Sequence, residues 1–215
     1  PLRNVNTINR SAKTIMTSLV NVLMALDSEG RKILHESSPS AKMSVMQVTI
    51  AAPWSYTVAK TISYKNEEEF TVTNNFLEEL LRMARLKVLE DLKENEKIHQ
   101  LGLSIVSRIT ADILVNGYSV KVTGKQKTKA IKVIEINSIA HENIVNEVDE
   151  LHEKMFPGNE LFKYSFMMSF FYTILDFYPD VAECCLVDIT YEATEIGIVR
   201  EGVLQYCTHI PYGAI

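Results

Sequence analysis

The sequence predicts a mixed α+β fold from two kinds of hydrophobic spacing and from the turn residues between them. Apolar residues that recur at helical spacing indicate amphipathic helices, whereas alternating or continuous β-branched and aromatic residues indicate strands. Turn-forming residues such as Pro53, Asn116 and Gly202 separate the expected strands. The predicted helices are 10–26, 75–98, 141–155 and 166–178, and the predicted strands are 43–53, 56–66, two or three strands within 103–140, 161–164, 184–188, 194–199 and 203–210.

The N-terminal third should hold one amphipathic helix and a strand pair. Helix 10–26 carries a stripe of leucine, isoleucine and valine side chains, and Gly30 in the polar stretch that follows should end or interrupt it. Strand 43–53 is apolar on both faces for part of its length, whereas strand 56–66 alternates. Because only the turn Pro53-Trp54-Ser55 separates them, we expect these strands to pair as a hairpin.

The middle of the chain should hold a capped helix and a meander. Asn75 and Glu78 have the spacing of a capping box at the start of helix 75–98. The segment 103–140 reads as strands with Asn116-Gly117-Tyr118 and the basic stretch 124–129 at the turns. A second amphipathic helix should follow and stop at the turn 156–159, which is the predicted domain boundary.

Composition describes an ordinary globular protein and excludes some function classes. The chain has 215 residues, 47% hydrophobic and 23% charged, which suffices for a core without disulfides or metal. A formal net charge of −5 argues against a general nucleic-acid binder. The apolar run 166–178 is shorter than the roughly 20 residues of a membrane-spanning helix, so we expect a buried core helix. Because the chain begins at Pro1 without a methionine, we expect a piece of a longer protein.

The remaining reactive and charged side chains favour structural roles. The three cysteines are odd in number and lack metal-ligand spacing, so we expect buried thiols in a reducing compartment. Trp54 should anchor its turn in the core, and the acidic run 66–69 should be a solvated loop. The histidines are scattered and no nucleophile motif is present, so we predict neither catalytic residues nor a metal site. The cysteines are Cys184, Cys185 and Cys207, and the histidines are His35, His99, His141, His152 and His209.

One hairpin resembles a phosphate-binding turn. In such hairpins an acidic residue ends a strand, small residues let backbone N–H groups approach phosphate oxygens, and a hydroxyl group adds a donor. Asp188 ends the first of three C-terminal strands, and Thr190 and Thr194 supply hydroxyl groups, so these three residues are the candidate cofactor-binding residues. Where glycines are expected, Tyr191 and Glu192 resist positive φ angles, and Glu192 adds negative charge. The alternative is a plain structural hairpin without a phosphate site.

The C-terminal third resembles the actin-like family that includes the cell-division protein FtsA and the type IV pilus assembly protein PilM. In that family a strand ending VDIG leads through GGT into a second strand, a tight turn and a third strand ending IP.GG. The sequence LVDITYEATEIGIVREGVLQYCTHIPYGA, residues 186–214, keeps this spacing without the glycines of the phosphate turn. The matching residues are Val187, Asp188, Ile189, Thr194, Gly202, Leu204, Ile210, Pro211 and Gly213. Residues 43–137 resemble the small module that these proteins insert into their first lobe.

The resemblance implies an N-terminal helix and linker (1–40), a strand-helix-strand insert module (41–156) and part of an actin-like, ribonuclease H-like lobe (159–215). It further implies a non-catalytic scaffold in the bacterial cytoplasm. A protein partner or self-association would use the insert module or the sheet edges, and any membrane contact would be indirect, through a partner. No cofactor is expected unless a longer chain completes a Mg-ATP cleft. The alternatives are an actin-like ATPase completed by residues outside this chain and an unrelated α+β binding protein.

Overall fold

A computed structural model describes residues 5–94, 102–120 and 126–214, and it confirms the mixed α+β class. Four strands form an antiparallel sheet in the order β2-β5-β3-β4, three form the antiparallel sheet β7-β8-β9, and two form the parallel pair β1-β6. None of the helices within these ranges is long and apolar enough to cross a membrane. The helices are α1 (Val5–Ser37), α2 (Asn74–Glu94), α4 (Glu142–Met155) and α5 (Phe166–Phe177). The strands are β1 (Val45–Ile50), β2 (Ser55–Val72), β3 (Leu103–Val115), β4 (Tyr118–Ser119), β5 (Gln126–His141), β6 (Glu160–Ser165), β7 (Cys184–Ile189), β8 (Thr194–Arg200) and β9 (Val203–Ile210).

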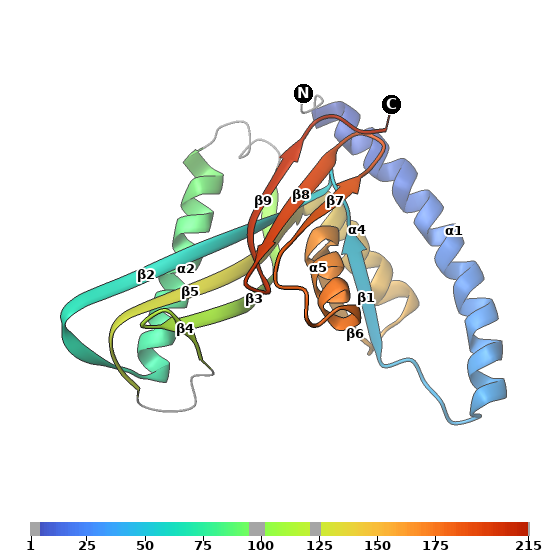
Figure 1. Ribbon diagram of the computed structural model, residues 1–215. Coiled ribbons are helices and arrows are strands. Elements are labelled where there is room, and N and C mark those ends of the chain that lie inside the picture. Colours follow the sequence, from blue (N-terminus) through green and yellow to red (C-terminus); the bar gives the residue numbers. More distant parts are fainter. Residues whose placement is uncertain (1–4, 95–101, 121–125, 215) are drawn as a thin grey trace.

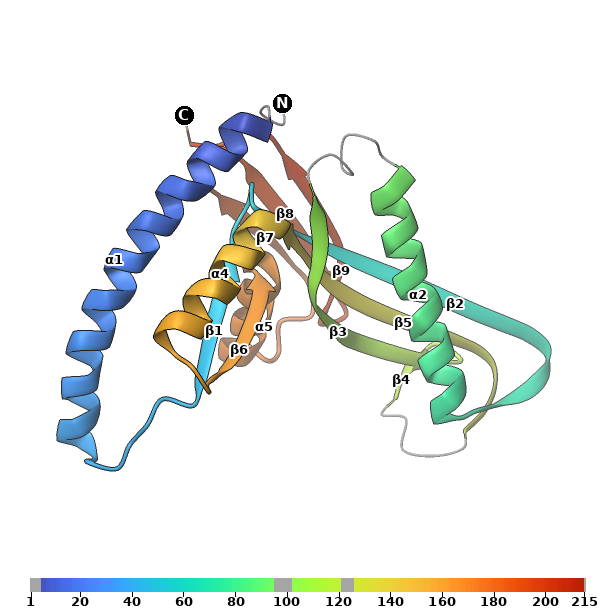
Figure 2. The ribbon, with the colours of Figure 1, turned by 180° about the vertical axis from the view of Figure 1, so that it is seen from behind.

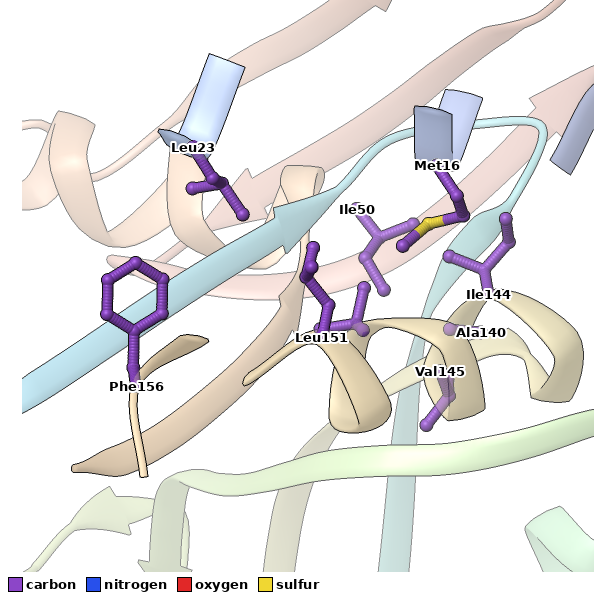
Figure 3. Packing of buried hydrophobic residues seen from close by; sticks show 9 residues of the cluster. Met16, Leu23, Ile50, Ala140, Ile144, Val145, Leu151 and Phe156 are labelled. Atoms are coloured by element: carbon purple, nitrogen blue, oxygen red, sulfur yellow. The ribbon is translucent and has the colours of Figure 1, made fainter. Parts of the chain in front are cut away.

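Helices lie on both sides of the strands (Figure 1). Helix α2 runs along one face of the four-stranded sheet, whereas α1 stands at the other end of the molecule and packs on α4 (Figure 2). Met16 and Leu23 of α1 meet Ile50, Ile144 and Leu151 in one hydrophobic cluster (Figure 3). A second cluster joins α5 to the three-stranded sheet, and a third lies under α2.

Several predictions from local sequence are confirmed. Helices α2, α4 and α5 begin within a residue of their predicted starts, although residues 95–98 of the first lie outside the described ranges. The predicted turns at Asn116-Gly117 and Glu201-Gly202 each join adjacent antiparallel strands with two residues of positive φ, as the Asn-Gly signal of the first requires. The three C-terminal strands form a single antiparallel sheet, as expected.

The predicted hairpin between the first two strands is wrong. Strand β1 pairs in parallel with β6, and β2 pairs antiparallel with β5. Trp54 N–H donates to the carbonyl of Ala51, and His141 N–H donates to the carbonyl of Trp54, so the turn is a corner that carries the chain from one sheet into the other. Exposure alternates along β1, where Val45, Gln47 and Thr49 are exposed, so one face of this short strand is not covered. The pair β1-β6 spans the predicted boundary at 156–159.

Two elements are longer than predicted. Helix α1 continues through Gly30, because one glycine costs a helix only about 1 kcal/mol and the Asp27–Arg31 ion pair, at 2.8 Å, spans the position. Strand β2 continues through the acidic residues 66–69, which are exposed and lie where its register with β5 shifts. The prediction of a loop there is therefore wrong, although the carboxylates are solvated as expected.

The cysteine prediction holds in part. Cys184 and Cys207 are partly buried, whereas Cys185 is exposed on the outer face of β7, so the expectation of three buried thiols is wrong for that residue. Cys185 is exposed although Cys184 is not, because successive side chains along a strand point to opposite faces of the sheet.

Helix α5 provides a direct test of the second hydrophobic cluster. Phe171→Ala should destabilise the protein by about 3–5 kcal/mol, because Phe171 is 2% exposed and its removal leaves a cavity. The matched control Phe177→Ala, at a side chain that is 73% exposed, should change the free energy of unfolding by less than about 0.5 kcal/mol. Urea denaturation measures both, and equal losses would contradict the packing of α5.

Candidate functional site

The candidate residues Asp188, Thr190 and Thr194 lie together at the tip of the hairpin between β7 and β8. Asp188 pairs in register with Glu195, and Ile189 pairs with Thr194. Thr190 N–H donates to the carbonyl oxygen of Ala193 at 2.9 Å, and the Thr190 hydroxyl group donates to the same oxygen at 2.8 Å. Ala193 N–H in turn donates to the Thr190 hydroxyl oxygen at 3.2 Å. The turn therefore satisfies these groups by itself.

The segment after β9 closes the same turn from outside. The Thr194 hydroxyl group donates to the carbonyl of Tyr212 at 2.7 Å, and Ala214 N–H donates to the carbonyl of Thr190 at 2.9 Å. Gly213 approaches so closely that a Cβ atom there would lie 2.2 Å from the carbonyl oxygen of Tyr191. Both candidate hydroxyl groups are thus engaged by backbone carbonyls of the protein.

The turn backbone has ordinary φ angles. Within the described ranges, the non-glycine residues with positive φ are Asn116 and Glu201, and neither lies in the turn 190–193. A backbone nest that binds an anion alternates right-handed and left-handed residues. The turn therefore lacks the left-handed residue that such a nest uses.

A second acidic residue, Glu195, lies beside Asp188 on the inner face of the sheet. Its side chain is 1% exposed, and its Oε1 atom accepts a hydrogen bond from Thr57 N–H on β2 at 2.8 Å. Within the described part of the chain, Glu195 Oε2 and Asp188 Oδ2 are buried without a hydrogen-bond partner. Burial raises the pKa of Glu195 to about 7, with the negative charge of Asp188 adding to the rise, and burial also raises the pKa of Asp188.

The neighbours of Glu195 on the third strand differ in exposure, since Cys207 is partly buried whereas His209 is exposed. His209 pairs with Glu195 in register, and its ring lies 4.1 Å from that of Tyr56, centroid to centroid. Burial lowers the pKa of His209, whereas burial and the nearby Glu195 raise the pKa of Cys207 to about 12. Across the described ranges, no three histidine, cysteine, aspartate or glutamate side chains are grouped so that they could hold a metal ion.

Glu195 was not among the candidate residues predicted from the sequence. The signal was the alternation along β8, which puts Glu195 on the same face as the buried residues Gly197 and Val199. Trp54 was interpreted correctly, because it packs partly buried against the cluster between α1 and α4.

Two glycines test how the C-terminal segment closes the turn. Gly213→Ala should release the segment and remove the protection of Ala214 N–H from solvent exchange, because the new Cβ atom would collide with backbone that cannot move aside. Gly30→Ala, in α1 with no atom within 4 Å of its Cβ position, should instead stabilise the protein by up to about 1 kcal/mol. Amide exchange by NMR measures the first effect and thermal unfolding measures the second. Full protection of the Ala214 amide in Gly213→Ala would contradict the contact.

Comparisons with known proteins give a likeness to solved structures alone. No family model matches the sequence, and no curated protein is similar to it. Among solved structures, the chain is similar to one titled "PilM-PilN type IV pilus biogenesis complex", with a TM-score of 0.48 and 12% sequence identity. The match covers 86% of this chain and 47% of that chain, so this chain spans about half of its length.

Proposed function

We propose that this chain is a scaffold or adaptor of the actin-like type, similar to cell-division or type IV pilus assembly proteins. It acts in the bacterial cytoplasm, and this chain by itself does not hydrolyse nucleotide. The observation that carries the proposal is the hairpin after Asp188, which has the strand and turn spacing of a phosphate hairpin while backbone carbonyls of Ala193 and Tyr212 engage both threonine hydroxyl groups. The proposed division is a module at 41–156 and a partial lobe at 159–215.

The electrostatics of the hairpin support a non-catalytic role. A phosphate group needs N–H donors and positive charge, whereas this end of the sheet holds two neighbouring carboxyl groups with raised pKa values. The turn itself also carries Glu192. Anionic phosphates would meet repulsion in place of donors.

The outer face of the three-stranded sheet supports a role in protein association. Register and exposure put an uncharged surface there, and Ile189 and Tyr206 are among its most exposed side chains. Strand β7 is an edge strand, with β8 as its hydrogen-bonded neighbour. Exposed edges of this kind favour pairing with another strand. The surface comprises Cys185, Val187, Ile189, Thr194, Ile196, Ile198, Tyr206, Thr208 and Ile210.

The insert module offers a second apolar surface. Helix α2 buries Leu80, Ala84 and Val88 against the four-stranded sheet, but it leaves Met83 and Leu86 exposed on its other side. This supports the module as a binding site for a protein partner.

Calorimetric titration tests the absence of nucleotide binding. With millimolar ATP and magnesium we expect no binding heat, because the turn lacks free hydroxyl donors and a backbone nest. Asp188→Ala should change stability but no hydrolytic rate. A micromolar dissociation constant that Asp188→Ala abolishes would favour the alternative, an actin-like ATPase completed by residues outside this chain.

Sedimentation equilibrium tests self-association through the edge of β7. The chain should form dimers, and Val187→Lys should weaken them by at least about tenfold, because a lysine on an edge strand opposes pairing. Glu201→Lys, which also introduces a lysine but in the exposed turn between β8 and β9, should leave association unchanged. Equal effects of both substitutions would contradict an interface at β7.

A further inference from the structure

A buried carboxyl group lies at the contact between the three-stranded sheet and β2. Strand β9 lies beside β2 (Figure 1), and Glu195 of β8 reaches β2 through the hydrogen bond from Thr57 N–H. Thr57 is itself buried, and its hydroxyl group shares a hydrogen bond with Ser165 at the start of α5. Glu195 thus links β8 to the point where β2 meets α5.

The remaining oxygen of Glu195 lacks a donor unless a proton supplies one. Asp188 and Glu195 are directly opposite on neighbouring strands, so their side chains leave the same face with Cβ atoms about 4.5–5.5 Å apart. Ionised carboxylate oxygens only accept hydrogen bonds. If both groups are ionised, Glu195 Oε2 and Asp188 Oδ2 therefore remain without a hydrogen bond. One shared proton gives the pair a donor and removes one buried charge.

The groups that face Glu195 do not compensate for a second negative charge. They are Asp188 on β7, Cys207 and His209 on β9, and Tyr56 on β2. Partial burial lowers the pKa of His209 and so disfavours its charged form, and burial raises the pKa of both Cys207 and Tyr56. Helix α5 adds the apolar side chains of Met167 and Phe171 to the same core.

We propose that Asp188 and Glu195 share one proton and that this proton latches the sheet β7-β8-β9 onto β2. Loss of the proton places two carboxylates side by side in the core, and separation of the sheet from β2 then lets water reach them. The latch is independent of nucleotide and of the proposed scaffold role. It makes the attachment of the C-terminal sheet sensitive to pH.

The direction of the effect follows from the raised pKa of Glu195. The unlatched state has the ordinary pKa of 4.5 and the latched state a pKa of about 7, so the latched state binds the proton more tightly. The stabilisation is complete below the lower value and is lost as the pH rises through about 7. Latching should therefore weaken as the pH rises across neutrality.

Hydrogen exchange with Glu195→Gln tests the latch. In the natural sequence, the protection of β8 and β9 amides, corrected for intrinsic exchange, should fall about tenfold between about pH 6 and about pH 8. Glutamine keeps the shape, accepts from Thr57 N–H and donates an amide N–H to Asp188 without ionising. Protection in this variant should therefore be the same at both pH values.

A control and a second readout complete the experiment. Glu183→Gln, at an exposed carboxylate just before β7, should retain the pH dependence of the natural sequence. The carbon-13 shift of the Glu195 carboxyl group should titrate near neutrality, and Asp188→Asn should move that titration to lower pH, because the asparagine amide stabilises the ionised form. The proposal is wrong if Glu195→Gln keeps the full pH dependence or if Glu195 titrates near 4.5 in the folded protein.

Discussion

Strand β5 is the element on which the rest of the fold depends. It pairs with β2 on one side and β3 on the other, and its side chains enter all three hydrophobic clusters. Ile131 and Val133 pack under α2, Ile136 packs on α5, and Ala140 packs between α1 and α4. Because β5 has two neighbours along most of its length, it carries no free edge there. One strand therefore contributes to the packing of α2, of α5 and of the helix pair α1 and α4.

This arrangement explains why a carboxyl group matters at the edge of the second cluster. The three-stranded sheet meets the rest of the molecule through α5 and through the beginning of β2. Apolar packing by Leu186, Val199 and Leu204 is insensitive to pH, whereas the polar contact between Glu195 and Thr57 is not. Buried polar groups that lack a partner are costly, so the protonation state of Glu195 affects this contact more than its single hydrogen bond implies.

Local signals predicted much of the fold, because helices and tight turns depend on neighbouring residues. The Asn116-Gly117 turn, the stripe of α2 and the apolar run of α5 all have short-range causes. The parallel pairing of β1 with β6 joins strands separated by more than a hundred residues, and no local pattern distinguishes it from a hairpin with β2. Glu195 was missed for a related reason, because its role requires Thr57 of β2 to lie against it.

In the candidate site, too, some features follow from neighbouring residues and others from residues distant in the sequence. The positions of Asp188, Thr190 and Thr194 on one hairpin follow from their spacing in the sequence. The hydrogen bond from the Thr194 hydroxyl group, however, requires the segment after β9 to bring the carbonyl of Tyr212 beside it. Gly213 is among the residues that carry the actin-like resemblance, and its structural requirement here is visible as close contact with the Tyr191 backbone. A glycine that permits close backbone approach can thus serve chain closure as well as ligand contact. The spacing of this hairpin can therefore have structural reasons that do not involve phosphate binding.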